Sequence, residues 1–332
     1  MDSAVAGLRA HQNKMDVVGH NIANVNTFGF KAQTYTFKEA MYQTSTASTA
    51  GGQTGGVNAA QYGYGTLMGS IGMDMTASTP SYVGGFNASI DGEGFFITAS
   101  SKLGGTTGVP SDAFKNEDFD YTRVGQFLVD SDGYVVDANG NYIYGFRVDD
   151  YTIDTNTGAI TDTQFKTNVL QPLRIPLATS NGGDKLADLE IKDDAGENNA
   201  SQSITIEINN VGEISATIRY DITKADGSTA KDSKVVSIGK VAIATFQNPN
   251  GVTKSGGNYY KAKEGDNTGA GIATVPGDAG TSTLMGGFLE ASNVDLAKEF
   301  ADMITTHRGF QANSKMITVS DEMLSDLVAM KR

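Results

Sequence analysis

Apolar residues seven positions apart mark the C-terminal end of this chain of 332 residues. The repeat consists of Leu289, Leu296, Met303, Phe310, Ile317 and Leu324, and it is widened by Phe300, Ile304, Leu327 and Val328. Such a heptad pattern predicts a long helix whose apolar face must pack against another helix. Ser292 and Asn293 stand just before the run, and both are residues that helix N-caps favour.

The N-terminal end carries a second heptad pattern, of about three repeats. Met1, Leu8, Met15 and Ile22 are seven apart, and they are interleaved with Ala4, His11, Val18 and Val25. Both helices could pack on a globular domain of their own. However, the segment after the first helix is too polar to offer a core. Eight seam residues gain about 2 kcal/mol each, against about 1.5 kcal/mol per residue for ordering some 25 residues. We therefore expect the two helices to pair and to be covered by neighbouring subunits.

Charge and proline are distributed unevenly along the chain. The net charge is -13, of which the segments 1–43 and 289–332 contribute little, and all six prolines lie between Pro80 and Pro276. An acidic surface disfavours nucleic acid and anionic membranes as partners. The chain has no cysteine, and no apolar run approaches about 18 residues, so disulfides, thiolate chemistry and a membrane span are not expected. No cleaved signal peptide is expected either.

The middle of the chain predicts antiparallel β-structure. Short apolar segments alternate with Asp-Gly and Asn-Gly turns from about Ser81 onward, which is typical of hairpins. A second alternating block runs through Ile204, Ile206 and Ile208, then Ile214, Ala216, Ile218 and Tyr220. The chain is thus expected to be an α+β multi-domain protein. Its middle domains are mostly antiparallel β, one inserted in the other.

The expected domains follow the same boundaries. Residues 1–30 and 287–332 supply the N- and C-terminal helices of a coiled-coil inner domain. Residues 31–80 form a connector that is flexible or extended, because Thr44 to Tyr62 carry no charge. Residues 81–147 with 239–286 form an inner β-domain, and residues 148–238 form an inserted outer β-domain.

Few residues suggest catalysis. Asp16 and His20 are four apart on one helix face, and the acidic pairs Asp91/Glu93 and Asp130/Asp132 lie beside turn glycines. Aspartate is favoured in such turns for their geometry alone, and neither pair continues into a calcium loop. We therefore expect no enzyme activity, no catalytic residue, no metal and no cofactor.

Four motifs, in order along the chain, resemble those of the bacterial flagellar rod and hook protein family. The sequence from Asn21 to Lys31, NIANVNTFGFK, resembles the family's NNIANxxTxGFK. IDGEGFF at 90–96 resembles DGxGFF, GFLEASNVDL at 287–296 resembles GxLExSNVDL, and RGFQANSK at 308–315 resembles RxFxANxK. FQNPNGV at 246–252 is similar to the FxNPNGL of hook proteins, so the resemblance favours the hook branch over the distal rod branch.

The resemblance implies a function in assembly. The chain would polymerise with itself into the curved tube of the hook, a universal joint that transmits torque from rod to filament. It would leave the cell unfolded through the flagellar type III export apparatus and become extracellular. Its other partners would be the distal rod protein, the hook cap and the hook-filament junction protein. The expected assembly interface comprises Leu8, Met15, Val18, Ile22, Asn24, Leu296, Phe300, Met303, Phe310, Ile317 and Leu324.

Three alternatives stay open. A distal rod protein would share the terminal motifs but form a straight shaft. An adhesin or carbohydrate-binding module would account for the β-rich middle and leave the heptad ends unexplained. A wall hydrolase would require a cleft with convergent carboxylates, such as Asp91 and Glu93.

Overall fold

The computed structural model describes residues 2–48, 50, 55–103, 108–110, 118–153, 160–165, 169–175, 203–223, 229–278 and 281–330. The chain divides into two compact units. Unit 1 comprises Met1–Thr27, Lys31–Asp74 and Ser292–Arg332, and unit 2 comprises Phe28–Phe30 and Met75–Ala291. Met1 and parts of the predicted outer β-domain, residues 148–238, lie outside the described residues.

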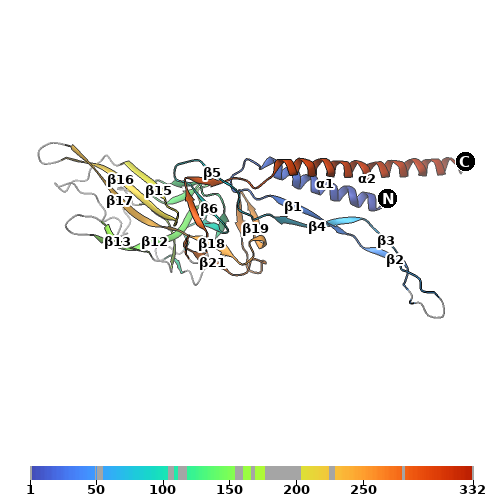
Figure 1. Cartoon of the computed structure of the whole chain (residues 1–332), viewed down its shortest axis with the longest axis horizontal. Helices are drawn as coiled ribbons and strands as arrows, with labels where there is room; N and C mark the ends of the chain where they lie inside the picture. Colours follow the sequence, from blue (N-terminus) through green and yellow to red (C-terminus); the bar gives the residue numbers. More distant parts are fainter. Residues whose placement is uncertain are drawn as a thin grey trace. The chain divides into compact units, whose positions relative to one another are not determined.

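Unit 1 combines two helices with two pairs of strands (Figure 1). Its elements are α1 (Asp2–Ala23), β1 (Gln33–Glu39), β2 (Tyr42–Thr46), β3 (Ala60–Gly63), β4 (Thr66–Met73) and α2 (Leu296–Met330). At 1.5 Å per residue, the 35 residues of α2 extend about 52 Å, against about 33 Å for the 22 residues of α1. Among the described residues, neither helix combines the length and the apolar character needed to cross a membrane.

The segment that we expected to be a flexible or extended connector contains regular strands. β1 pairs antiparallel with β4, and β2 pairs antiparallel with β3. Alternating threonine and aromatic residues in β1 favour a strand, and Thr36 Oγ1 also lies 2.8 Å from Ser70 Oγ across the pair. The uncharged stretch from Thr44 to Tyr62 contributes residues to β2 and β3, which are extended, and its part as a connector stays a prediction.

Unit 2 is built from short antiparallel strands. They are β5 (Pro80–Tyr82), β6 (Ala88–Asp91), β7 (Phe95–Ala99), β8 (Val109–Pro110), β9 (Asp120–Thr122), β10 (Phe127–Val129), β11 (Val135–Asp137), β12 (Tyr142–Ile153), β13 (Ile160–Phe165), β14 (Val169–Pro172), β15 (Ser203–Ile208), β16 (Glu213–Thr223), β17 (Thr229–Val241), β18 (Ile243–Phe246), β19 (Thr253–Gly256), β20 (Tyr259–Lys261), β21 (Gly271–Thr274), β22 (Thr283–Gly286) and β23 (Phe288–Glu290), with a 3-10 turn at Pro249–Gly251.

The longest path through the sheets of unit 2 runs β15-β16-β17-β12-β7-β9-β20-β19. β12 lies near the middle of this path. Its residues Tyr142 and Ile143 pair with β7, and its residues 145–147 pair with residues 239–241 of β17. The mostly antiparallel β-structure expected for the middle of the chain is confirmed.

One buried cluster draws on both predicted β-domains. Phe96, Phe127 and Ile143 come from the first, whereas Ile214 and Ile238 come from the second, and all five are at most 2% exposed. Of the alternating isoleucines, Ile214 thus lies in a core, and Ile206 and Ile208 pack against it, as period-two patterns require. The insertion of one domain in the other stays a prediction, since this cluster spans both.

Candidate assembly interface

α1 and α2 pack side by side and run antiparallel (Figure 1). Gly7 lies against Asn313 and Gly309 lies against His11, so early residues of α1 face late residues of α2. Further along, Lys14 Nζ pairs with Asp302 Oδ1 at 3.0 Å. Both glycines sit at close approaches: a methyl group on Gly309 would lie 2.7 Å from the His11 ring. The helices that the sequence predicted at the two ends therefore do pair.

Asn21 fixes the end of this helix pair. Its amide oxygen accepts a hydrogen bond from the backbone N–H of Gln33 at 2.9 Å, and its amide nitrogen donates to the Gln33 carbonyl at 2.8 Å. The same nitrogen donates to Glu299 Oε1 at 3.0 Å. Asn21 is fully buried and Glu299 is 7% exposed. One amide thus joins α1, the chain entering β1 and the first turn of α2.

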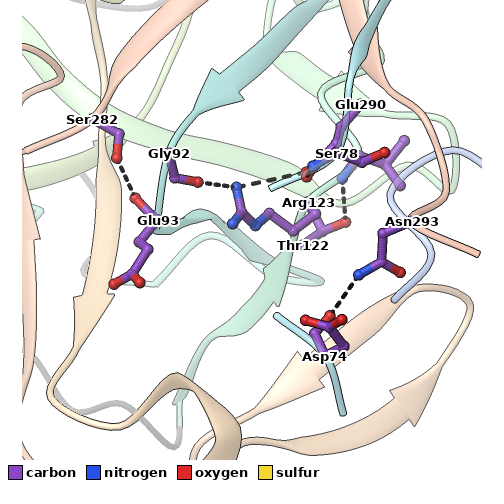
Figure 2. A network of polar contacts seen from close by, with 10 residues as sticks. Asp74, Ser78, Gly92, Glu93, Thr122, Arg123, Ser282, Glu290 and Asn293 are labelled. Atoms are coloured by element: carbon purple, nitrogen blue, oxygen red, sulfur yellow. Dashed lines mark hydrogen bonds and ion pairs between the residues drawn. The ribbon is translucent and has the colours of Figure 1, made fainter. Parts of the chain in front are cut away.

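The start of α2 differs from the sequence prediction. Asp295 is the N-cap, since its Oδ1 accepts from the backbone N–H groups of Ala297 and Lys298. Asn293 instead accepts from the N–H of Ala32 and donates to the carbonyl of Asp74 (Figure 2). Leu289, the first residue of the predicted heptad run, lies in the buried strand β23. The heptad pattern alone could not separate this strand residue from the helix.

The predicted interface residues fall into three groups. Val18 is buried, and Leu8, Met15, Ile22, Asn24, Met303, Phe310 and Ile317 are half-buried. Leu296, Phe300 and Leu324 are exposed, by 39%, 49% and 51%. Asn24 also ends α1: its side chain donates to the His20 carbonyl at 2.9 Å and accepts from the Thr27 hydroxyl at 3.3 Å. Whether these residues contact other subunits stays a prediction.

The C-terminal part of α2 extends past α1. Because Gly7 is opposite Asn313 and His11 is opposite Gly309, the first residue of α1 lies opposite about residue 318. Residues 319–330 therefore continue beyond α1, as Figure 1 also shows. They include Val319, Met323, Leu324, Leu327, Val328 and Met330, all of them exposed. A helical segment this apolar has no partner among the described residues of its own chain.

A groove lies between α1 and β4. Its lining residues are Asp2, Val5, Ala6, Arg9, Ala10, Asn13, Thr66, Leu67 and Met68, and its volume is about 430 Å³. Most of this lining is apolar, and Arg9 supplies its positive charge. The groove belongs wholly to unit 1.

Arg123 and Glu290 form a buried ion pair in unit 2 (Figure 2). Arg123 is 2% exposed and donates to the Gly92 carbonyl at 2.8 Å, and the same nitrogen lies 3.6 Å from the Glu290 carboxylate. Burial lowers the pKa of Arg123, and the charge of Glu290 opposes that shift. The other Glu290 oxygen accepts from the N–H of Ser78, and the Glu290 carbonyl accepts from the N–H of Gly29. Glu290 therefore ties together the three segments through which the chain enters and leaves unit 2.

The motif glycines of unit 2 have a structural role. Gly92 and Gly94 both adopt positive φ, at 125° and 131°. A side chain at Gly94 would strike Ile243, and Gly92 presents its carbonyl to Arg123. DGEGFF thus forms a tight turn between β6 and β7 that only glycine accommodates.

Several residues considered for catalysis have contacts of their own in the structure. Asp130 accepts from the N–H of Ser131 in its own turn, at 2.7 Å, and the carbonyl of Glu93 accepts from Ser282 Oγ at 2.7 Å. His20 lies 3.4 Å from Asn24. Within the described ranges, no three His, Asp or Glu side chains gather as metal ligands.

Two family models match the ends of the chain. Residues 1–31 match the model described as "Flagella basal body rod protein", and residues 285–330 match "Flagellar basal body rod FlgEFG protein C-terminal". These ranges contain α1, the start of the loop after it, and α2. The matched ends are thus the parts that form the helix pair.

Several curated proteins are similar over the whole chain. The flagellar basal-body rod protein FlgG of Bacillus subtilis is 35% identical across 99% of this chain and 98% of its own length. The flagellar hook protein FlgE of Borreliella burgdorferi is 28% identical across 99% and 98%. A further similarity covers only part of the chain: the hook protein FlgE of Caulobacter vibrioides is 39% identical over 38% of this chain and 19% of its own length. Similarity therefore extends to proteins of both names.

Proposed function

Because the chain belongs to the family of flagellar basal-body rod and hook proteins, we propose that it is the structural subunit of the flagellar hook. It polymerises into a curved helical tube that transmits torque from the rod to the filament. The observation that carries the proposal is the exposed apolar part of α2, residues 319–330, which extends past α1. Covering this apolar face with a neighbouring copy removes it from water, which is the main favourable term in protein association.

The shape of unit 1 supports an open polymer. The end of α2 protrudes, and the groove between α1 and β4 is concave, so two different surfaces are offered. Contacts between unlike surfaces add subunits head to tail, and they generate helical polymers when the rotation does not close. The helices would then line the inner part of the tube, as a supercoiled core, and the β-structure would lie outside.

The charge pattern suits a joint whose subunits move past one another. The chain carries -13 net charge, concentrated in its middle, and no Lys or Arg occurs between Glu39 and Ser101. Acidic outer surfaces repel each other and stay hydrated, which reduces adhesion between neighbouring subunits. The uncharged strand pair β2-β3 is exposed throughout. It would deform when neighbouring subunits shift relative to one another.

The proposal includes export and neighbouring components. The chain would pass unfolded through the flagellar type III export apparatus and assemble outside the cell, where it would meet the distal rod protein, the hook cap and the hook-filament junction protein. The lack of cysteine fits this route, because no disulfide could form before export.

A second candidate is the distal rod protein. It is favoured by the 35% identity to a protein named as a rod component, which matches this chain over nearly its full length. The hook is favoured by the FQNPNGV segment, where Asn248 caps the 3-10 turn Pro249–Gly251 directly after β18.

Electron microscopy of the polymer assembled from purified chain separates the two. A hook subunit is expected to form curved tubes, and a rod subunit short, straight ones. If the tubes were straight under all conditions, the chain would be assigned as a rod subunit and not as a hook subunit. If the chain stayed monomeric at high concentration, both assignments would be wrong.

A further inference from the structure

α2 carries an exposed apolar stripe whose methionines continue the row of Asp302 and Gly309, which contact α1, toward and past the end of α1. Its members are Met316, Val319, Met323, Leu327 and Met330, each between 38% and 77% exposed. Their spacing of three, four, four and three residues places them on one helix face. The seam residues Met303, Phe310 and Ile317 lie on another face and are half-buried. We call the exposed set the methionine stripe.

We propose that the methionine stripe of one copy docks into the α1/β4 groove of a second copy. This inference rests on the proposed function, since it specifies the contact by which copies of the chain add to one another. An amphipathic helix lying in an apolar groove through residues of this spacing is a common mode of recognition.

Most of the stripe, from Val319 onward, lies beyond the part of α2 that is opposite the groove of its own chain. Groove residues Asp2 to Asn13 lie opposite about residues 307–318 of α2 in the helix pair. Met323 lies about 7 Å, and Met330 about 18 Å, beyond that span along the helix. A continuous helix cannot fold back onto its neighbour, so a second copy must supply the stripe.

One ion pair can form between the two surfaces. Residues 319–330 contain Asp321, Glu322 and Asp326 and no basic residue. Asp326 adjoins the stripe, because it lies three residues after Met323 and one before Leu327. In the groove, Arg9 is exposed and can pair with such a carboxylate. The groove also contains Asp2, so the attraction rests on Arg9 and not on a net positive charge.

Methionine gives the contact a useful property. Three of the five stripe residues are methionines seven positions apart. The unbranched thioether side chain repacks readily into differently shaped spaces. A methionine contact can therefore stay buried while the angle between two copies changes, which a tube that bends as it rotates requires.

Cross-linking in the cysteine-free chain tests this contact. We would mix two full-length single-cysteine variants, Val5→Cys in the groove and Met323→Cys in the stripe, and treat them with a short bismaleimide. The matched control replaces Met323→Cys by Ser325→Cys, which is also exposed but lies about 200° around the helix. Each expected product joins two different copies, and its mass distinguishes it from dimers of a single variant.

We expect at least about tenfold more 5–323 than 5–325 product, as befits a contact stabilised by a buried apolar anchor. Reversing the groove charge with Arg9→Glu should lower the yield, and Asp326→Arg on the stripe variant should restore it. Equal yields from Met323→Cys and Ser325→Cys would overturn the docking. If curved tubes formed without the 5–323 product, the docking would be wrong and the proposed function would stand. If the product formed without tubes, the docking would stand and the proposed function would be wrong.

Discussion

Asn21 donates a 3.0 Å hydrogen bond to Glu299, a residue 278 positions later in the chain. Both side chains are buried, and Asn21 also holds both backbone groups of Gln33. The two ends of the chain are thus joined by polar contacts at one end of the helix pair, while the apolar end of α2 stays exposed. This division explains how a subunit can be ordered internally and still require neighbours.

Replacing Asn21 by leucine should destabilise unit 1. The change leaves Glu299 and the Gln33 backbone groups buried without their partner, at a cost of about 1–3 kcal/mol. Urea unfolding followed by helical circular dichroism measures the difference. Gln12→Ala, an exposed change on the same helix, is the control and should shift the free energy of unfolding by less than about 0.5 kcal/mol.

Two glycine substitutions should have opposite signs. Gly19→Ala on α1 meets nothing within 4 Å and should stabilise the helix by about 0.5–1 kcal/mol. Gly309→Ala on α2 would press on the His11 ring and should cost about 1–3 kcal/mol through overpacking. Thermal unfolding of both variants gives the answer, and stabilisation by both would contradict the close contact between α1 and α2.

Breaking the Arg123–Glu290 pair should weaken unit 2. Arg123→Met leaves a buried carboxylate without its cation, at about 3–5 kcal/mol, and Glu290→Met leaves the opposite charge. The double variant should cost less than the two single changes together. Chemical unfolding measures all three, and Lys261→Met, in a more exposed pair with Asp120, should cost less than about 1 kcal/mol.

The helix pair should lose stability in mild acid because of His11. Burial, followed by the nearby charge of Lys14, lowers the pKa of His11 below its usual 6.5, and its Nδ1 is buried without a hydrogen bond. The unfolded chain therefore binds the proton more readily than the folded one. The folded chain is therefore more stable above pH 6.5, the pKa of His11 in the unfolded chain. This stability is lost as the pH falls from there through the lower pKa of His11 in the folded chain.

Unfolding measured between about pH 7 and pH 5 should show this loss in the natural chain. His11→Phe keeps a ring against Gly309 and Phe37 and should flatten that part of the profile. An unchanged slope in His11→Phe would assign the acid sensitivity to other groups.

The sequence was most informative where structure is periodic. The heptads predicted both terminal helices, and the alternation of Ile214 and Ala216 predicted residues that are indeed buried. The period carries this information because one face must leave water. It could not show that the residues against α2 would include Gly7 and Lys14, since packing between two helices depends on both surfaces.

Polar contacts between residues far apart in the chain leave no local pattern in the sequence that would predict them. Arg123 and Glu290 lie far apart in sequence, and neither stands in a periodic run that would mark it as buried. Asn21, Glu290 and Asn293 did fall within the family motifs, which marked them without giving their partners. Asn293 was misread as an N-cap because its competing partners, Ala32 and Asp74, are brought near only by the fold.

The most direct test of the account is a helical reconstruction, by electron cryomicroscopy, of the polymer assembled from purified chain. The account predicts that α2 of each subunit lies within about 8–10 Å of a helix of another subunit, on the inner wall of the tube, with β-structure outside. A polymer held together by its β-units, with α1 and α2 facing solvent, would contradict it.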